Sequence, residues 1–256
     1  MGTLEYLDRD GSGFRLRGEQ VTRLETFVDA AFAFSLSLLV IFTSDLPQSA
    51  AELREALKRV PGFVACFALL MMFWAAHNRW SRRTGLEDAR ATVLSLAFVL
   101  VVMVYVYPLR MVVSSFLSLL TGGWLPSELG EGAGTALRDL QTAFIVYSLG
   151  FGLLAWLLWR MNAHALRHSA ALGLDRNEVH QLRTETGSHA ILAAVSLASL
   201  MLGLVLYAID PLPVGGWRLV AGAPMWIYAT LALWMPWFHT ARERRRLALP
   251  VDGDAR

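Results

Sequence analysis

The chain has 256 residues, of which 55% are hydrophobic and 17% are charged, and its formal net charge is +2 at pH 7. A soluble domain carries about 25% charged residues, so this composition excludes a disordered or collagen-like chain, and the single cysteine excludes a scaffold of internal disulfides. A bilayer-spanning helix needs about 20 mostly apolar residues. Because the apolar residues come in long unbroken runs, the sequence predicts a multi-span membrane protein.

Six segments of the chain are long and apolar enough to cross a bilayer. They cover about residues 24–44, 60–80, 90–117, 140–161, 189–209 and 217–239. A buried core helix is the alternative for any one run, but six runs in one chain favour membrane spans. The sequence therefore predicts an all-α membrane protein in which residues 1–256 form a single six-span unit. The polar N-terminus and the late start of the first run argue against a cleavable signal peptide.

A short helix is predicted between the first two spans. Ser49 and Glu52 have the spacing of a capping box, in which both side chains accept hydrogen bonds from backbone N–H groups at a helix start. In the last span, Pro224 and Pro236 predict a kink or an end of the helix, because proline removes a backbone donor and clashes with the preceding turn.

Basic residues are distributed unevenly between the two sides of the predicted membrane. If the segments between spans alternate sides, 17 of the 23 lysines and arginines fall on the side that holds both termini. Cytoplasmic loops carry an excess of these residues. We therefore expect a multi-pass protein of the cell membrane with both termini in the cytoplasm. In bacteria this membrane would be the inner membrane. Nucleic acid is not an expected partner, because the basic loops alternate with membrane spans.

Polar residues at one end of the first two spans form a candidate network. Asp29 lies inside the first span, Arg23 lies six residues earlier, and Trp74 and His77 share a face near the end of the second span. Ionisable groups within a membrane are expensive, so we expect these side chains to meet at one depth. They could do no more than tie two helices together, because buried polar groups need partners whatever their function.

The first span also carries an apolar stripe. Phe34, Leu38 and Ile41 lie at i, i+4 and i+7, and Ser37 joins them on the same face. From the residues alone, an ordinary packing stripe is favoured over a functional one.

Two motifs resemble the transmembrane protein 175 family of potassium channels. The residues from Arg23 to Asp29 match the family signature Arg-x-x-x-Phe-Ser-Asp except at Val28, and those from Trp74 to His77 match its Trp-x-x-His motif. The resemblance is strong over about residues 20–110 and consistent in hydropathy thereafter. It implies a potassium-selective or potassium-preferring channel, not an enzyme, in which six-span subunits assemble as a homotetramer.

The resemblance also implies roles for individual residues. The first span would line the pore, with a hydrophobic constriction at Phe34, Leu38 and Ile41 and a selectivity hydroxyl at Ser37. The residues that hold the pore helix in place would be Arg23, Phe27, Asp29, Trp74 and His77. Potassium would be the permeant ion, no cofactor is expected, and the partners would be further copies of the chain and the lipid bilayer.

Other functions remain open from the sequence. An ion-coupled or proton-coupled transporter could use Asp29 and His77 as a relay, and a non-conducting relative of the family would have the same pattern. His164 and His168 stand at i and i+4, as a metal-binding pair can. No carboxylate or cysteine lies at ligand spacing beside them, so two solvated histidines are favoured. Enzyme motifs such as a Gly-rich phosphate loop or His-Glu-x-x-His do not occur.

Overall fold

A computed structural model describes residues 7–18, 20–41, 47–129, 136–209 and 222–247. The helices are α1 (Arg23–Ile41), α2 (Ala50–Leu57), α3 (Val60–Thr84), α4 (Ala89–Leu120), α5 (Ala136–Arg167), α6 (Arg176–Ala208), α8 (Ala223–Ala229) and α9 (Leu231–Leu247). Across these ranges the fold is all-helical, and the β-type pairing is limited to one bridge between Arg9 and Arg15.

Five helices, α1, α3, α4, α5 and α6, overlap the first five predicted spans, and α6 begins at Arg176, before the predicted residue 189. Among the described residues, four helical stretches are long and apolar enough to cross a membrane, namely Ala50–Thr84, Ala89–Leu120, Arg138–Arg167 and Arg176–Ala208. α1 occupies the predicted first span, and its 19 residues extend about 28 Å, close to the hydrocarbon thickness of about 30 Å. Ser49 caps α2 as predicted, since its side chain accepts from the N–H of Glu52. The end of the first predicted span, residues 42–44, lies outside the described residues.

The sixth predicted span is divided in two. α8 ends at Ala229 and α9 begins at Leu231, so the helix breaks at Thr230 and not at a proline. Pro224 lies in the first turn of α8, where its missing N–H needs no partner, and Pro236 lies inside α9. The predicted start of this span, residues 217–221, lies outside the described part of the chain.

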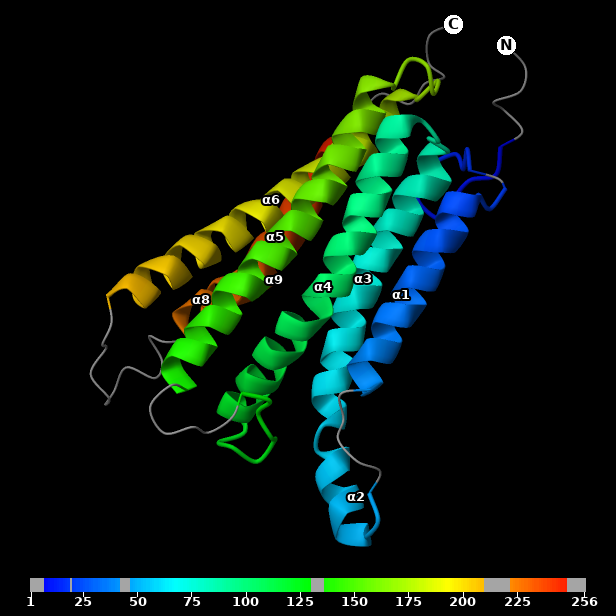
Figure 1. The fold of residues 1–256 in the computed structure, drawn as a ribbon. Coiled ribbons are helices and arrows are strands. Elements are labelled where there is room, and N and C mark those ends of the chain that lie inside the picture. The colour runs from blue at the N-terminus through cyan, green and yellow to red at the C-terminus, as the bar shows by residue number, and fades with distance from the viewer. Residues whose placement is uncertain (1–6, 19, 42–46, 130–135, 210–221, 248–256) are drawn as a thin grey trace, which may run out of the picture.

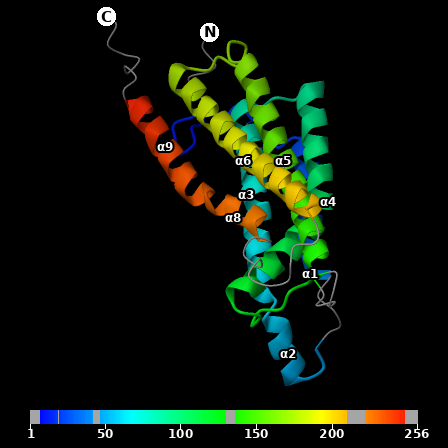
Figure 2. The same ribbon diagram turned by 90° about the vertical axis from the view of Figure 1, so that its left-hand side faces the viewer.

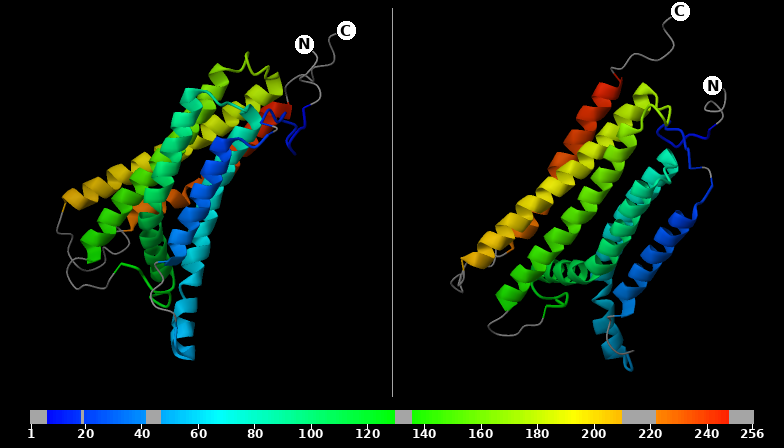
Figure 3. Two further views of the ribbon diagram at one scale, coloured as in Figure 1. Left: turned by 45° about the vertical axis from the view of Figure 1, so that its right-hand side comes forward. Right: turned by 45° about the horizontal axis from the view of Figure 1, so that its top comes forward.

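The bundle has α1 at one edge. α1 packs on α3 and α4, α5 packs on α4 and α6, and α8 and α9 pack along α6 (Figures 1 and 2). In the right-hand view of Figure 3, the helices follow one another in the order α9, α6, α5, α4, α1. Because α1 is a flanking helix, none of the other described helices covers its outward face.

Aromatic side chains fill the centre of the bundle between α3, α4 and α5. Phe73 of α3 packs edge-on against Phe98 of α4 and Phe151 of α5, with ring centroids 6.4 Å and 5.2 Å away. α5 approaches α4 closely at Gly150, where an added Cβ would lie 2.5 Å from the ring of Tyr105. A side chain at position 150 would therefore push these two helices apart.

Hydroxyl groups join α5, α6 and α8. Ser148 and Ser199 share a hydrogen bond of 2.9 Å, Ser199 Oγ donates to the Pro224 carbonyl at 2.7 Å, and Ser196 bonds Tyr228 at 2.9 Å. Between helices in lipid, small polar residues permit close approach and supply hydrogen bonds. These bonds hold α8 against the α5–α6 pair.

One end of the bundle is closed by the segment that precedes α1, and we call it the N-terminal end. Gly18 N donates to the Arg82 carbonyl at the end of α3, and Arg17 Nε donates to the Leu172 carbonyl in the α5–α6 connection. The side chain of Phe14 is fully buried there. The opposite end holds α2 and the loop that follows α4 (Figure 1).

Candidate functional site

A reciprocal cap fixes the start of α1. Thr22 Oγ1 accepts from the N–H of Glu25 at 3.1 Å, and Glu25 Oε2 accepts from the N–H of Thr22 at 3.0 Å. This is the capping-box arrangement, which satisfies backbone donors that a helix start leaves unpaired. The Thr-x-x-Glu spacing in the sequence is the signal for this cap, which was not among the predicted features.

α1 has one face inside the subunit and one face outside it. The inner face is buried and consists of Val28, Phe32, Ser35 and Leu39, spaced i, i+4, i+7 and i+11. The outer face is exposed in the single chain and consists of Ala30, Ala33, Phe34, Ser37 and Val40. Packing within the subunit therefore uses only half of this helix.

The stripe predicted to line a pore is divided by this arrangement. Phe34 is 52% exposed, and Ser37 lies on the same outer face with its hydroxyl bonded to the Ala33 carbonyl of its own helix. Leu38 is half-buried and packs against the subunit core. The side chain of Ile41 lies outside the described part of the structure. Phe34 and Ser37 thus lie on the exposed face of α1 in the single chain, whereas Leu38 turns towards the subunit core.

Asp29 and Trp74 connect α1 to α3 near the N-terminal end. Trp74 Nε1 donates to Asp29 Oδ1 at 2.7 Å. An ionised acceptor makes such a bond stronger than a neutral one. This contact joins the two signature motifs directly.

His77 lies close to this pair but bonds to a different helix. Its Nε2 and the Ser95 hydroxyl of α4 share a hydrogen bond of 3.0 Å, and its ring stacks on Phe98 with centroids 5.4 Å apart. His77 and Asp29 face a common cavity of about 230 Å³, which Glu25 and Arg82 also line. His77 therefore extends the contact from α1 and α3 to α4.

The other signature residues are not drawn into this contact. Arg23 is exposed at the first residue of α1, and Phe27 is 52% exposed on the outer surface. Val28, which replaces the signature serine, is 1% exposed and belongs to the hydrophobic core. The structure thus brings together three of the five predicted network residues, Asp29, Trp74 and His77.

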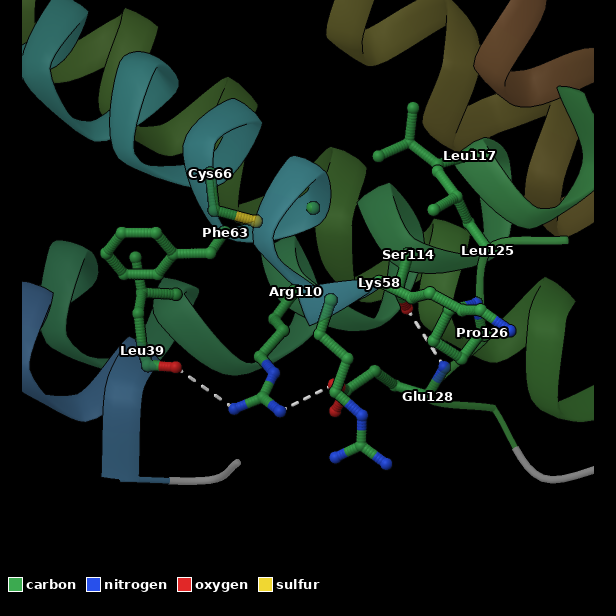
Figure 4. A pocket seen from close by; sticks show the side chains of 12 residues that line it. Leu39, Lys58, Phe63, Cys66, Arg110, Ser114, Leu117, Leu125, Pro126 and Glu128 are labelled. Carbon is green, nitrogen blue, oxygen red and sulfur yellow. Dashed lines mark hydrogen bonds and ion pairs between the residues drawn. The ribbon is translucent and has the colours of Figure 1, made fainter. Parts of the chain in front are cut away.

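Arg110, which was not among the predicted site residues, anchors the opposite end of α1. Its guanidinium donates to the Leu39 carbonyl at 3.1 Å and pairs with Glu128, in the loop after α4, at 2.5 Å (Figure 4). A positive charge at a helix C-terminus satisfies an unpaired carbonyl and interacts favourably with the helix dipole. A lone arginine between apolar stretches was the signal available in the sequence.

The outer surface of the bundle is apolar along whole helices. On α4, for example, Val93, Leu100, Val104 and Tyr107 are exposed on one side. Large exposed apolar surfaces mark contact with lipid or with other subunits. An all-helical bundle with such a surface, joined inside by hydrogen bonds between helices, defines a multi-pass membrane protein.

Comparisons with known proteins agree with this class. The family model of the endosomal/lysosomal potassium channel TMEM175 matches residues 23–108. A protein of Marivirga tractuosa named "Potassium channel" is 30% identical over 199 residues, which are 75% of this chain and 78% of that protein. A crystal structure of a variant of the potassium channel MtTMEM175, in complex with a nanobody–MBP fusion protein, is similar with a TM-score of 0.73 and 26% identity, over 91% of this chain and 100% of that one.

The chain belongs to the TMEM175 family. This is a family of ion channels and not of enzymes, which answers the enzyme alternative left open by the sequence.

Proposed function

We propose that this protein is a potassium channel, a homotetramer in which four copies of α1 surround the pore. The observation that supports this most directly is the outer face of α1, which the subunit leaves exposed at the edge of the bundle. The names of the relatives, potassium channels, give the permeant ion. In this proposal residues 1–256 form a single six-span unit, with α1 as the first span and α8–α9 as the sixth.

The constriction lies on α1. Rings of Phe34, Leu38 and Ile41 around the axis would be narrow and apolar, and narrow apolar rings expel water and so stop ions without a moving plug. Ser37 would place a ring of hydroxyl groups between them and offer the dehydrating ion partial coordination. Because Leu38 is already half-buried in the subunit, a small rotation of α1 can withdraw its side chain from the pore axis, and this rotation widens the pore on opening.

The motif residues hold the pore helix in place and do not touch the ion. Asp29 and Trp74 fix α1 to α3, and His77 ties α3 to α4 through Ser95. Arg23 and Phe27 are exposed in the single chain, and in the proposed tetramer they face neighbouring subunits. Both termini are cytoplasmic, because the basic residues gather at the N-terminal end.

Recordings from the purified protein in planar bilayers test this function. We expect single-channel current steps with a reversal potential that follows the potassium gradient. Smooth currents without steps, or an obligatory coupling to a proton gradient, would indicate a carrier instead.

Two pore variants test the constriction. We expect Phe34→Asn and Leu38→Asn to wet the apolar rings, raise cation flux into liposomes and weaken the preference for potassium over sodium. Leu100→Asn is the matched control, because Leu100 is exposed on α4, away from the α1 face. Unchanged flux in both pore variants, with intact oligomers, would place the permeation path elsewhere.

A further inference from the structure

A cluster of three potential metal ligands lies at the N-terminal end of the bundle, away from α1. Asp88 is the residue before α4, and its Oδ1 caps that helix by accepting from the N–H of Ala91 at 2.8 Å. Its second oxygen, Oδ2, lies 2.7 Å from Nε2 of His164 in the last turn of α5. The chain thus supplies the carboxylate beside the histidine pair that was missing in the linear sequence.

The second histidine is oriented as a ligand. His168 lies one turn beyond His164, and the two rings are 4.5 Å apart. His168 Nδ1 is 3.0 Å from the His164 carbonyl, which can only accept, so Nδ1 carries the proton and Nε2 carries the lone pair. Metal-binding histidines are commonly held this way, with the other ring nitrogen bonded to a backbone carbonyl.

The distances between the ligand atoms suit one ion. Each residue offers one ligand atom, and these three atoms lie within 4.8 Å of one another. Around tetrahedral zinc, with bonds of about 2.0–2.2 Å, neighbouring ligand atoms are separated by about 3.4 Å. The observed separations therefore need only small side-chain rotations, which the partly exposed His168 and the exposed Asp88 permit.

We propose that Asp88, His164 and His168 bind a divalent transition-metal ion of the zinc type, with water completing the coordination. Two imidazoles and one carboxylate form a nitrogen-rich set that suits zinc better than calcium or magnesium. The ion displaces the proton that His164 shares with Asp88 and releases it to solvent. The bound metal connects the start of α4 to the end of α5. This site does not depend on the proposed conduction.

Zinc binding to the full-length protein tests the site. The protein is purified in detergent with a tag that contains no histidine, treated with chelator and titrated with Zn²⁺ against a fluorescent chelator. We expect a single tight site per chain, and we expect His168→Gln and Asp88→Asn each to weaken it by at least about tenfold. Asparagine retains the cap of α4, because its side-chain oxygen also accepts from a backbone N–H.

The matched control is His180→Gln. His180 also lies at the N-terminal end but bonds the Arg242 carbonyl, so zinc affinity should not change in this variant. Zinc should also raise the melting temperature of the wild type and of His180→Gln but not that of Asp88→Asn. An unchanged zinc affinity in either ligand variant would overturn the proposal, as would the absence of a tight site in the wild type.

Discussion

Glu178 shows how a single carboxylate can be fully buried at the edge of a membrane domain. It is 0% exposed, and it accepts hydrogen bonds at 2.8 Å from both Arg15 and Arg17. Burial alone would raise the pKa of this group, but the bonds from the two arginines and from the backbone outweigh it and lower the pKa from 4.5 to about 2. The carboxylate is therefore ionised in the folded protein at every physiological pH.

This lowered pKa predicts a defined loss of stability in acid. A group whose pKa is lower in the folded state than in the unfolded state stabilises the protein at any pH above its unfolded-state pKa. This contribution is lost as the pH falls from about 4.5 towards 2. We expect Glu178→Gln to lower the melting temperature at pH 7, since breaking a buried ion pair costs about 3–5 kcal/mol. Tryptophan-fluorescence melting between pH 7 and pH 3 measures this.

Comparing the wild type with Glu178→Gln isolates the contribution of this carboxylate to stability. The difference in melting temperature between wild type and Glu178→Gln should shrink as the pH falls below 4.5. A constant difference across this range would mean that the ionisation of Glu178 does not contribute to stability.

Some contacts between single residues could be anticipated from the sequence and others could not. Asp29 and Trp74 were expected to meet, because an acid and an indole donor stood at the same depth of adjacent spans. The partner of His77 was not expected, because Ser95 is one of several hydroxyls in α4. Asp88 was not matched to His164 because 76 residues separate them and only the fold brings them together.

At the scale of elements, α1 is held at its two ends. Trp74 holds it through Asp29 near the start, and Arg110 holds it through the Leu39 carbonyl near the end. The outer face between these contacts is exposed. A helix pinned in this way can turn about its axis without leaving the subunit, as the proposed opening requires.

Loss of the first contact should weaken assembly. We expect Asp29→Ala to reduce the oligomer on size-exclusion chromatography, because the hydrogen bond from Trp74 to a charged group contributes about 1.5–3 kcal/mol to the position of α1. Trp74→Phe removes the same hydrogen-bond donor but keeps an aromatic ring. It should therefore also reduce the oligomer, but by less than Asp29→Ala does. If Asp29→Ala leaves the oligomer intact and changes selectivity, Asp29 lines the ion pathway.

Loss of the second contact should loosen the other end of α1. Arg110→Met removes the donor to Leu39 and leaves Glu128 without this partner. We expect a lower melting temperature, by the equivalent of about 3 kcal/mol, together with increased cation leak in liposomes. Arg54→Met is the control, because Arg54 is an exposed arginine on α2. Equal melting temperatures for the two variants would show that the Arg110 contacts contribute no stability.

The helices themselves were the most predictable part of the fold. Apolar runs of sufficient length located α1 and α3 to within a few residues. Such a run forms a helix in lipid, because a helix satisfies all its backbone hydrogen bonds within the segment. α6 begins at Arg176, well before the predicted residue 189, because Asp175 and Glu178 form a capping box ahead of polar turns. Hydropathy cannot detect helical turns that continue beyond the apolar run.

At the scale of the whole molecule, the two ends of the bundle differ in composition. The N-terminal end carries the arginine-rich segments, and the opposite end carries α2 and the loop after α4. We therefore expect a cysteine in place of Trp124 to react with an impermeant thiol reagent from outside the cell, and one in place of Ala170 to be protected. Both positions are exposed, and Cys66→Ser removes the native buried thiol. The reverse labelling would contradict the proposed orientation.

The ion pair between the N-terminal segment and the start of α6 has a consequence for biosynthesis. Arg15 precedes Glu178 by 163 residues, and at about 5–20 residues per second a ribosome needs roughly 10–30 s to make that interval. During this time the first four predicted spans are synthesised, while Arg15 and Arg17 still lack their partner Glu178. In the proposed orientation, these arginines can therefore act first as signals that retain the N-terminus on the cytoplasmic side. They close the N-terminal end of the bundle only later, when α6 emerges and delivers their counter-ion.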